Sequence, residues 1–101
     1  MLKAAVVLAL ALVGAPAQTN DFPPELIARG PDIYERYCSP CHGPRLIGDE
    51  SAFDLRKFPR DQRERFVNSV TRGKNAMPPW GDLLNPEDID ALWAYVMTGG
   101  R

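Results

Sequence analysis

The chain has 101 residues, a formal net charge of −1 and 25% charged residues. This length favours one small domain, and the absence of excess positive charge argues against nucleic acid as a partner, because phosphate binding depends on a basic surface. The basic segment from Arg56 to Lys74 is interleaved with Asp61 and Glu64. A solvated helix face explains it at least as well as a docking patch.

The N-terminus has the features of a secretory signal peptide. Lys3 gives a positive start, residues 4–13 are an unbroken apolar run, and Ala15-Pro16-Ala17 has the small-x-small pattern that a signal peptidase cleaves. The run is about half of the roughly 20 apolar residues that a membrane span needs. We expect a cleaved signal over 1–17, one domain over 18–101, a periplasmic location and no membrane span after cleavage. The alternative is a retained N-terminal anchor.

The next segment predicts a first helix. Pro31 suits a first helical position and is preceded by Gly30, so we expect a helix from Pro31 to Ser39 that ends at Pro40 or through the geometry of the motif that follows. The preceding segment, 22–29, contains two prolines and is either a turn or a short helix.

Two further helices are predicted downstream. Asp61 is expected to cap a helix that has an apolar stripe and stops at Gly73. Asn85 is expected to cap the last helix, with Pro86 as its first residue and Gly99 at its end. The apolar side chains of these two helices are Phe66, Val67 and Val70, and Ile89, Leu92, Trp93 and Val96. Strand signals are weak, so the predicted fold is all-α, with irregular loops between three main helices.

Both cysteines and the single histidine of the chain lie together in Cys38-Ser-Pro-Cys41-His42. A zinc site would need a fourth ligand, such as a carboxylate. A thioredoxin-like pair would be expected at the start of a helix after a strand, and here the motif follows a helix. A structural disulfide over this spacing would close too short a loop to stabilise the domain much.

The fourth interpretation is covalent attachment of c-type haem, for which C-x-x-C-H is the signature. Cys38 and Cys41 would form the two thioethers, and His42 would bind the iron. This interpretation also explains the apolar residues in the two irregular segments, which a large apolar ligand would bury. We therefore expect one covalent haem c.

The sixth iron ligand is expected to be Met77. Pro78 keeps Met77 out of the helical region, and Pro78-Pro79 stiffens the loop. Met/His ligation raises the reduction potential of haem iron. Met97 lies near the end of a predicted helix, where a packing role is expected. If Met77 does not bind, the iron is open and the protein is a haem sensor or a peroxidase-like protein.

Three segments together resemble class I cytochrome c: "ARGPDIYERYCSPCHG", "NAMPPWGDLLNPEDI" and "LWAYVMTG". By this resemblance Gly30 and Tyr34 cross Leu92 and Tyr95 in a close helix contact. The resemblance also implies that a backbone carbonyl, often beside a proline, orients His42. Pro44 lies close to the motif and Pro59 lies far from it, so the acceptor stays open.

Residues 53–96 are also similar to small cytochromes and cytochrome domains associated with pyrroloquinoline-quinone alcohol and methanol dehydrogenases. This similarity implies a non-enzymatic one-electron carrier that accepts electrons from a periplasmic dehydrogenase and passes them to a terminal oxidase or another cytochrome. Further expected site residues are Trp80, Leu46 and Ile47 as the haem pocket, and Arg45, Arg56 and Lys57 as partners of the propionates. A second alternative is a redox or structural module without haem.

Overall fold

The computed structural model describes residues 22–48 and 52–100, so the predicted signal peptide lies outside the described residues. The elements in order are α1 (Pro24–Ile33), the π-helical turn η2 (Tyr34–Cys38), α2 (Ser39–His42), the 3-10 turns η3 (Pro44–Leu46) and η4 (Leu55–Lys57), α3 (Arg63–Arg72) and α4 (Pro86–Met97). The described residues contain helices and one isolated β-bridge but no strand. The predicted all-α class is confirmed.

The first helical segment is longer than the sequence predicted. Helical structure runs without a break from Pro24 to His42 through α1, η2 and α2, so the predicted start at Pro31 and end near Ser39 were wrong. Pro24 takes the first helical position, where its missing N–H costs nothing. Pro31 lies inside α1 and withdraws a donor from the carbonyl of Ile27, which lies on an exposed part of the helix.

The π-helical turn explains how the segment continues past Pro40. The backbone N–H of Ser39 donates to the carbonyl of Tyr34, five residues back. The carbonyl of Glu35 would then need a donor from residue 40, and proline has none. The hydroxyl of Ser39 supplies it and donates to the Glu35 carbonyl at 2.8 Å. The helix therefore carries the cysteine motif on its final turns.

Helix α3 starts two residues after the predicted cap. Its N-cap is Gln62, without a side-chain capping bond, so the prediction for Asp61 was wrong. The predicted stop is confirmed, because Gly73 is the C-cap with φ of 81°. A positive φ is a conformation that glycine adopts at no steric cost.

Helix α4 begins as predicted. The side chain of Asn85 accepts the N–H of Asp88 at 2.8 Å, and the carboxylate of Asp88 accepts the N–H of Asn85 at 3.1 Å. This reciprocal pair is a capping box, which satisfies donors that the helix start leaves unpaired. Pro86 is the first helical residue.

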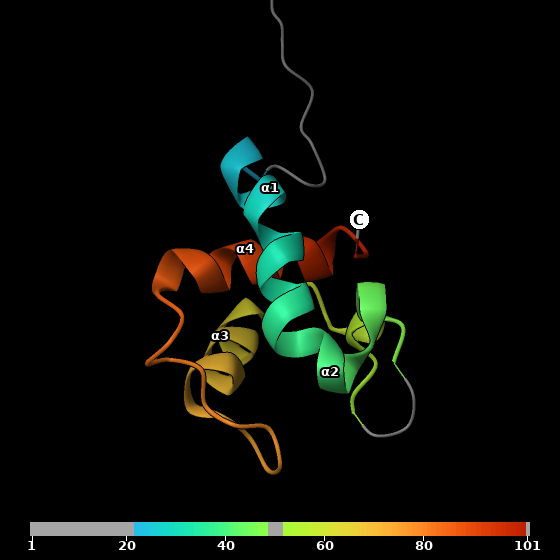
Figure 1. Ribbon diagram of the computed structural model, residues 1–101, viewed down its shortest axis with the longest axis vertical. Helices are drawn as coiled ribbons and strands as arrows, with labels where there is room; N and C mark the ends of the chain where they lie inside the picture. The colour runs from blue at the N-terminus through green and yellow to red at the C-terminus, as the bar shows by residue number, and fades with distance from the viewer. Residues whose placement is uncertain (1–21, 49–51, 101) are drawn as a thin grey trace, which may run out of the picture.

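Helices α1 and α4 cross closely, and Figure 1 shows α1 lying over the middle of α4. A Cβ placed on Gly30 would lie 2.6 Å from the carbonyl oxygen of Ala91 and 3.1 Å from the Cβ of Tyr95. Only glycine allows this approach, so the close crossing expected from the resemblance is present, with Ala91 and Tyr95 nearest the glycine. The rings of Tyr34 and Tyr95 extend the contact, with centroids 4.9 Å apart.

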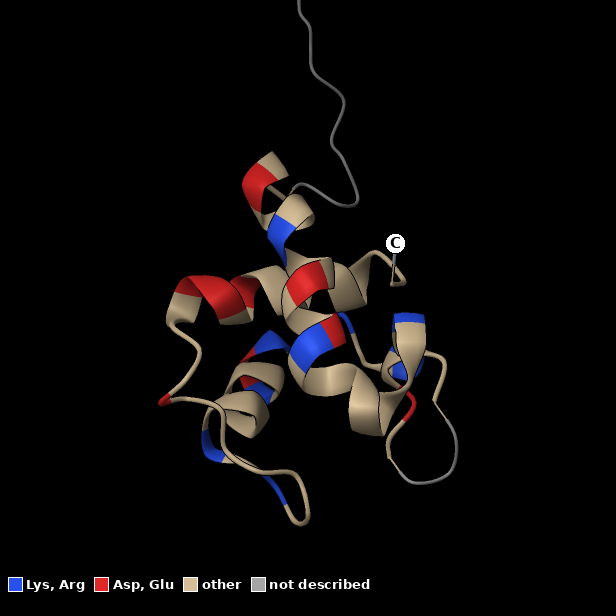
Figure 2. Ribbon diagram, viewed as in Figure 1, with Lys and Arg blue, Asp and Glu red and all other residues tan. Residues whose placement is uncertain are grey.

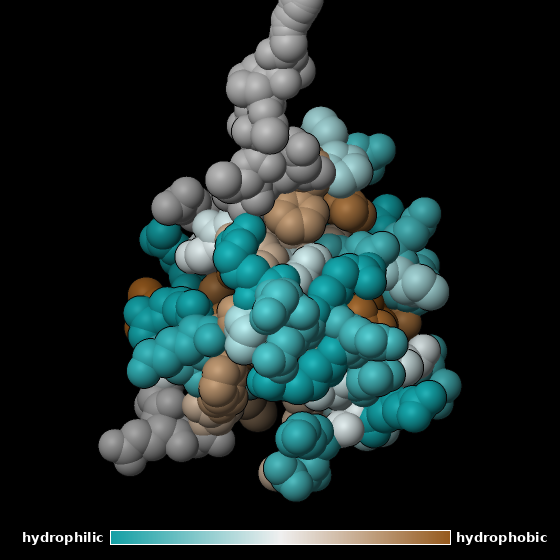
Figure 3. All heavy atoms as spheres, turned by 180° about the vertical axis from the view of Figure 1, so that it is seen from behind, coloured by the Kyte–Doolittle hydropathy of each residue, from teal (hydrophilic) through white to brown (hydrophobic). Residues whose placement is uncertain are grey.

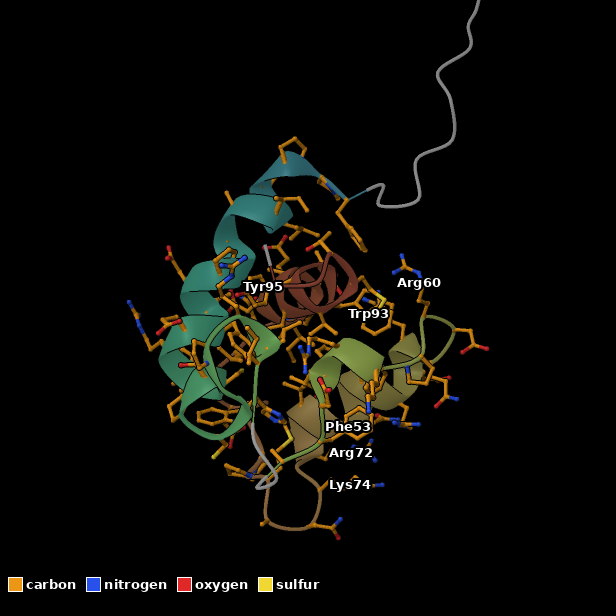
Figure 4. All side chains as sticks on the ribbon, turned by 90° about the vertical axis from the view of Figure 1, so that its right-hand side faces the viewer. Phe53, Arg60, Arg72, Lys74, Trp93 and Tyr95 are labelled. Carbon is orange, nitrogen blue, oxygen red and sulfur yellow. The ribbon has the colours of Figure 1, made fainter. Side chains whose placement is uncertain are left out.

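The other side of α4 packs on α3 and η4 through aromatic side chains. The Trp93 ring lies 5.2 Å from Phe66 and 5.9 Å from Phe58, measured between centroids. Figure 4 shows Tyr95 on the side of α4 toward α1, and Trp93 on the side toward the segment with Arg60. Residues 91–97 are all buried, as the central element of such a core requires.

Charges and apolar groups are distributed unevenly over the surface. Acidic residues gather at the start of α4, and basic residues are spread over the first helical segment, the 3-10 turns, α3 and the loops beside α3 (Figure 2). The face seen in Figure 3 is largely hydrophilic, with scattered apolar side chains between the charged ones. None of the helices described is both long enough and apolar enough to span a membrane.

Candidate functional site

The two cysteines lie one helical turn apart at the end of the first helical segment. Cys38 ends η2 and is half-buried, Cys41 is exposed in α2, and neither is in a disulfide. Burial, and secondarily the neighbouring Cys41, raises the pKa of the Cys38 thiol to about 12. A redox-active thiol requires a lowered pKa. The direction of this shift, and the position of the motif at a helix end, argue against the thioredoxin-like interpretation.

His42 is the last residue of α2, and its ring is oriented by the loop that follows. Its Nδ1 donates to the backbone carbonyl of Phe53 at 3.3 Å. A carbonyl can only accept, so this bond places the proton on Nδ1 and leaves Nε2 as the free lone pair. The sequence left the acceptor of His42 open, and neither Pro44 nor Pro59 marks it.

The loop after the motif, residues 43–48, makes close contacts between backbone atoms. Gly43 has φ of 85°, and a Cβ there would lie 2.0 Å from the carbonyl oxygen of Ile47. Arg45 and Leu46 both have positive φ, at 54° and 68°. Gly100 closes the loop from the other end of the chain, because a Cβ on it would lie 2.7 Å from the Arg45 carbonyl oxygen.

The two pocket residues expected in this loop, Leu46 and Ile47, and the expected propionate partner Arg45 divide between core and surface. Leu46 is fully buried within the main apolar cluster, Ile47 is 56% exposed, and Arg45 is exposed. Tyr34 connects the same loop to the core, since its hydroxyl donates to the Gly43 carbonyl at 2.6 Å.

Met77 lies in a small hairpin at the end of α3. The N–H of Lys74 donates to the carbonyl of Met77 at 3.0 Å, and the N–H of Met77 donates to the carbonyl of Lys74 at 2.9 Å. Gly73 permits this turn, because a Cβ there would lie 2.7 Å from the Met77 carbonyl oxygen. The side chain of Met77 is half-buried against the apolar cluster. Its backbone is thus held independently of any ligand.

Trp80, the third expected pocket residue in the chain's loops, approaches the helical segment that carries the cysteines. Its ring centroid lies 5.4 Å from that of Tyr37, with the planes inclined at 52°. Tyr37 directly precedes Cys38, and all three side chains pack on the edge of the apolar cluster together with Met77. Sequence reasoning assigned no site role to Tyr37 or Phe53, and the only signal was their apolar character beside the motif and in the following loop.

Two of the three basic residues expected near the propionates lie on η4, and the third, Arg45, lies on η3. Arg56 and Lys57 are both exposed. The guanidinium of Arg56 is bound to the carboxylate of Asp54 at 3.0 Å through both Nε and Nη2. This pair lowers the pKa of Asp54 and raises the pKa of Arg56. Arg56 therefore already has an anionic partner within the protein.

These residues fit a flat apolar cofactor that is attached by sulfur and bound at a metal by nitrogen and sulfur. Two thiols project one turn apart, an imidazole is oriented with Nε2 available, and a thioether lies on a rigid loop. Ile47 and Phe53 are apolar side chains that are more than half exposed to solvent, and such a cofactor would cover them. Across residues 22–48 and 52–100, no three His, Cys, Asp or Glu side chains are grouped as a metal site.

Comparison with known proteins identifies the family. The family described as "Cytochrome C oxidase, cbb3-type, subunit III" matches residues 25–96. Cytochrome c6 of Microcystis aeruginosa is 36% identical over 74 residues, which cover 68% of this chain and 91% of that protein. The crystal structure of cytochrome c6C from Synechococcus sp. PCC 7002 superposes with a TM-score of 0.56 at 30% identity, over 69% of this chain and 92% of that chain.

A larger relative matches over a small part of its length. Quinohemoprotein alcohol dehydrogenase ADH IIB of Pseudomonas putida is 33% identical over 93 residues, which cover 83% of this chain. This chain spans only 14% of that protein. The similarity therefore concerns one region of the larger protein.

Proposed function

Because this chain belongs to the cytochrome c family, as a small class I member with one covalent c-type haem, we propose that it is an exported one-electron carrier whose iron is held between His42 and Met77. The family assignment makes the protein an electron carrier rather than an enzyme. The observation that carries the ligand assignment is the orientation of the His42 ring, whose Nδ1 is engaged by Phe53 and whose Nε2 is left for a metal.

Each proposed ligand comes with its own support in the chain. Cys38 and Cys41 would hold the haem by thioethers, since both are outside any disulfide and lie on one helix. Met77 would supply a soft thioether ligand. It lies in a hairpin whose two backbone hydrogen bonds fix the backbone of Met77 relative to Lys74. When bound, the haem supplies an iron that alternates between ferric and ferrous states.

The remaining residues of the proposed haem site would contact different parts of the haem. Trp80 and Leu46 would shield the iron site from water, Trp80 from the loop that follows Met77 and Leu46 from within the core. Ile47 would contact the haem edge from a surface position. Arg45 and Lys57 are the better propionate partners, because Arg56 is already paired with Asp54.

The proposed location and partners are supported by the N-terminal sequence and by the relatives. The signal-like segment over 1–17 supports a periplasmic location for the domain over 18–101. The similarity to a quinohemoprotein alcohol dehydrogenase supports a periplasmic dehydrogenase as electron donor. An oxidase or another cytochrome would accept the electron.

An optical spectrum of the purified holoprotein tests the ligand assignment. A closed His42/Met77 site predicts a weak far-red methionine-to-iron band in the oxidised form and no spectral change when carbon monoxide is added to the reduced form. Met77→Ala should abolish the band and admit carbon monoxide, whereas Met97→Leu should change neither. If the wild-type protein binds carbon monoxide, the proposal of an electron carrier with a closed iron site is wrong, and the open-iron sensor or peroxidase-like alternative is favoured.

A further inference from the structure

Tyr37 and Trp80 connect the two parts of the chain that carry the proposed iron ligands. Tyr37 lies in η2, directly before Cys38 and on the same helical segment as His42. Trp80 lies three residues after Met77. Their ring centroids are 5.4 Å apart with an interplanar angle of 52°, within the range in which aromatic rings attract each other.

The Met77 loop is held on its other side by backbone hydrogen bonds to α3. The N–H of Trp80 donates to the carbonyl of Val70 at 2.8 Å, and the N–H of Gly81 donates to the carbonyl of Thr71 at 3.1 Å. These bonds place the loop relative to α3, but α3 is a separate element from the helix that carries His42. The distance between the two ligands therefore depends on contacts that cross from the loop to that helix.

We propose that Tyr37 and Trp80 form a latch, the Tyr37–Trp80 latch, that positions Met77 and keeps the sixth coordination position of the iron closed to small molecules. This inference rests on the proposed His42/Met77 ligation. Tyr37 and Trp80 are positioning residues, because they act through Met77 and not on the iron itself.

The latch has a defined expected strength. The attraction between two aromatic rings adds to the free energy gained by burying their surfaces. This addition changes the equilibrium between the closed and the open Met77 loop by about two- to tenfold. Opening of the Met77 loop must precede entry of an external ligand. Loss of the ring pair should therefore strengthen the binding of an external ligand by about the same factor.

The test uses the holoprotein and two probes, imidazole for the ferric form and carbon monoxide for the ferrous form. Tyr37→Leu and Trp80→Leu remove one ring each and keep apolar bulk. Tyr37→Phe and Trp80→Phe keep a ring at each position. Ile89→Val is the matched control, because it removes one methyl group from a residue of α4 that is 4% exposed and that belongs to neither ring of the pair.

Imidazole should bind to both leucine variants about two- to tenfold more tightly than to the wild type, and carbon monoxide should bind faster. The double leucine variant should show no further gain beyond either single variant, since the two rings act as one contact. The phenylalanine variants and Ile89→Val should bind like the wild type. Leucine variants that bind imidazole no more tightly than Ile89→Val, or single effects that add in the double variant, would overturn the latch.

Failure of the latch and failure of the proposed ligation give different results. If Met77 does not bind iron, the wild type itself lacks the far-red band and binds carbon monoxide. If the latch is wrong but the ligation is right, the leucine variants keep both the band and the wild-type resistance to imidazole. A variant that fails to fold is replaced by Tyr37→Ile or Trp80→Met, which are judged by the same two probes.

Discussion

The Nδ1 of His42 donates to the carbonyl oxygen of Phe53 at 3.3 Å, and the two residues are eleven positions apart in the chain. The acceptor is a backbone atom, so the identity of the side chain at position 53 has little influence on this bond. A hydrogen-bonded imidazole is a more basic metal ligand, and a more basic ligand favours ferric iron.

Phe53→Leu, which keeps an apolar side chain at this position, is therefore expected to leave the reduction potential of the holoprotein nearly unchanged, whereas deletion of Ala52, which shifts the Phe53 carbonyl, should raise it. Redox titration of both variants measures the effect. The nitrogen resonance of Nδ1 should show an attached proton in the wild type. Equal shifts of the potential in the two variants would contradict a backbone acceptor.

Tyr34 is expected to make the stability of the protein sensitive to alkaline pH. Burial is the main cause that raises its pKa from 10.0 to about 12, and a backbone hydrogen bond at Leu46 offsets this in part. The folded protein thus keeps its proton above pH 10, where the unfolded chain loses it. Stability is therefore expected to be full well below pH 10 and to fall by roughly 1–2 kcal/mol as the pH rises to about 12.

Urea unfolding at a series of pH values from 8 to about 12 checks this prediction. Tyr34→Phe should lower stability at pH 8, because the hydrogen bond to Gly43 is lost, but should flatten the alkaline decline. Part of the decline should persist, since the pKa of Tyr95 is also raised by burial. An unchanged slope in Tyr34→Phe would show that another group is responsible.

Gly30→Ala is expected to separate the α1–α4 crossing. The added methyl would meet the Ala91 carbonyl oxygen at 2.6 Å and the Tyr95 Cβ at 3.1 Å, so one helix must shift. Overpacking of this kind costs about 1–3 kcal/mol of unfolding free energy. Ala28→Leu adds more volume at an exposed position of the same helix and should stay within about 0.5 kcal/mol of the wild type. Similar losses in both variants would argue against a tight crossing.

Gly73→Ala should disturb Met77 without touching its side chain. Gly73 has φ of 81°, and a Cβ there would lie 2.7 Å from the Met77 carbonyl oxygen and 2.9 Å from the nitrogen of Pro79. Given the proposed ligation, the oxidised holoprotein should lose much of its far-red methionine band. Asn75 also has a positive φ, and Asn75→Gly should preserve the band because glycine accepts that conformation. A full band in Gly73→Ala would mean that the hairpin does not position Met77.

Local signals predicted the parts of the fold that local chemistry determines. The cap at Asn85 followed from an N-cap residue, a proline and two acidic residues in order, and the structure contains a capping box there. The start of α1 was missed because a proline is typical of the first position of a helix, which made Pro31 the expected start. In the structure Pro31 lies inside α1, which packs against α4. Tertiary contacts override a single proline when the lost hydrogen bond lies at the surface.

In the candidate site, too, local sequence predicted some features and tertiary structure determines the others. Cys38, Cys41 and His42 were predicted as haem-binding residues from their spacing, which is a local property of the sequence. The contact of His42 with Phe53 and that of Tyr37 with Trp80 depend on how loops close in three dimensions. Any backbone carbonyl can accept a hydrogen bond, so the sequence contains no mark that distinguishes the one at Phe53.

The close approach of Gly30 to Tyr95 joins two residues that are far apart in the sequence. Contacts of long sequence separation slow folding, because the intervening chain must first be closed into a loop. The crossing of α1 and α4 is therefore expected to make this domain fold more slowly than a helical protein that is held together by local contacts alone.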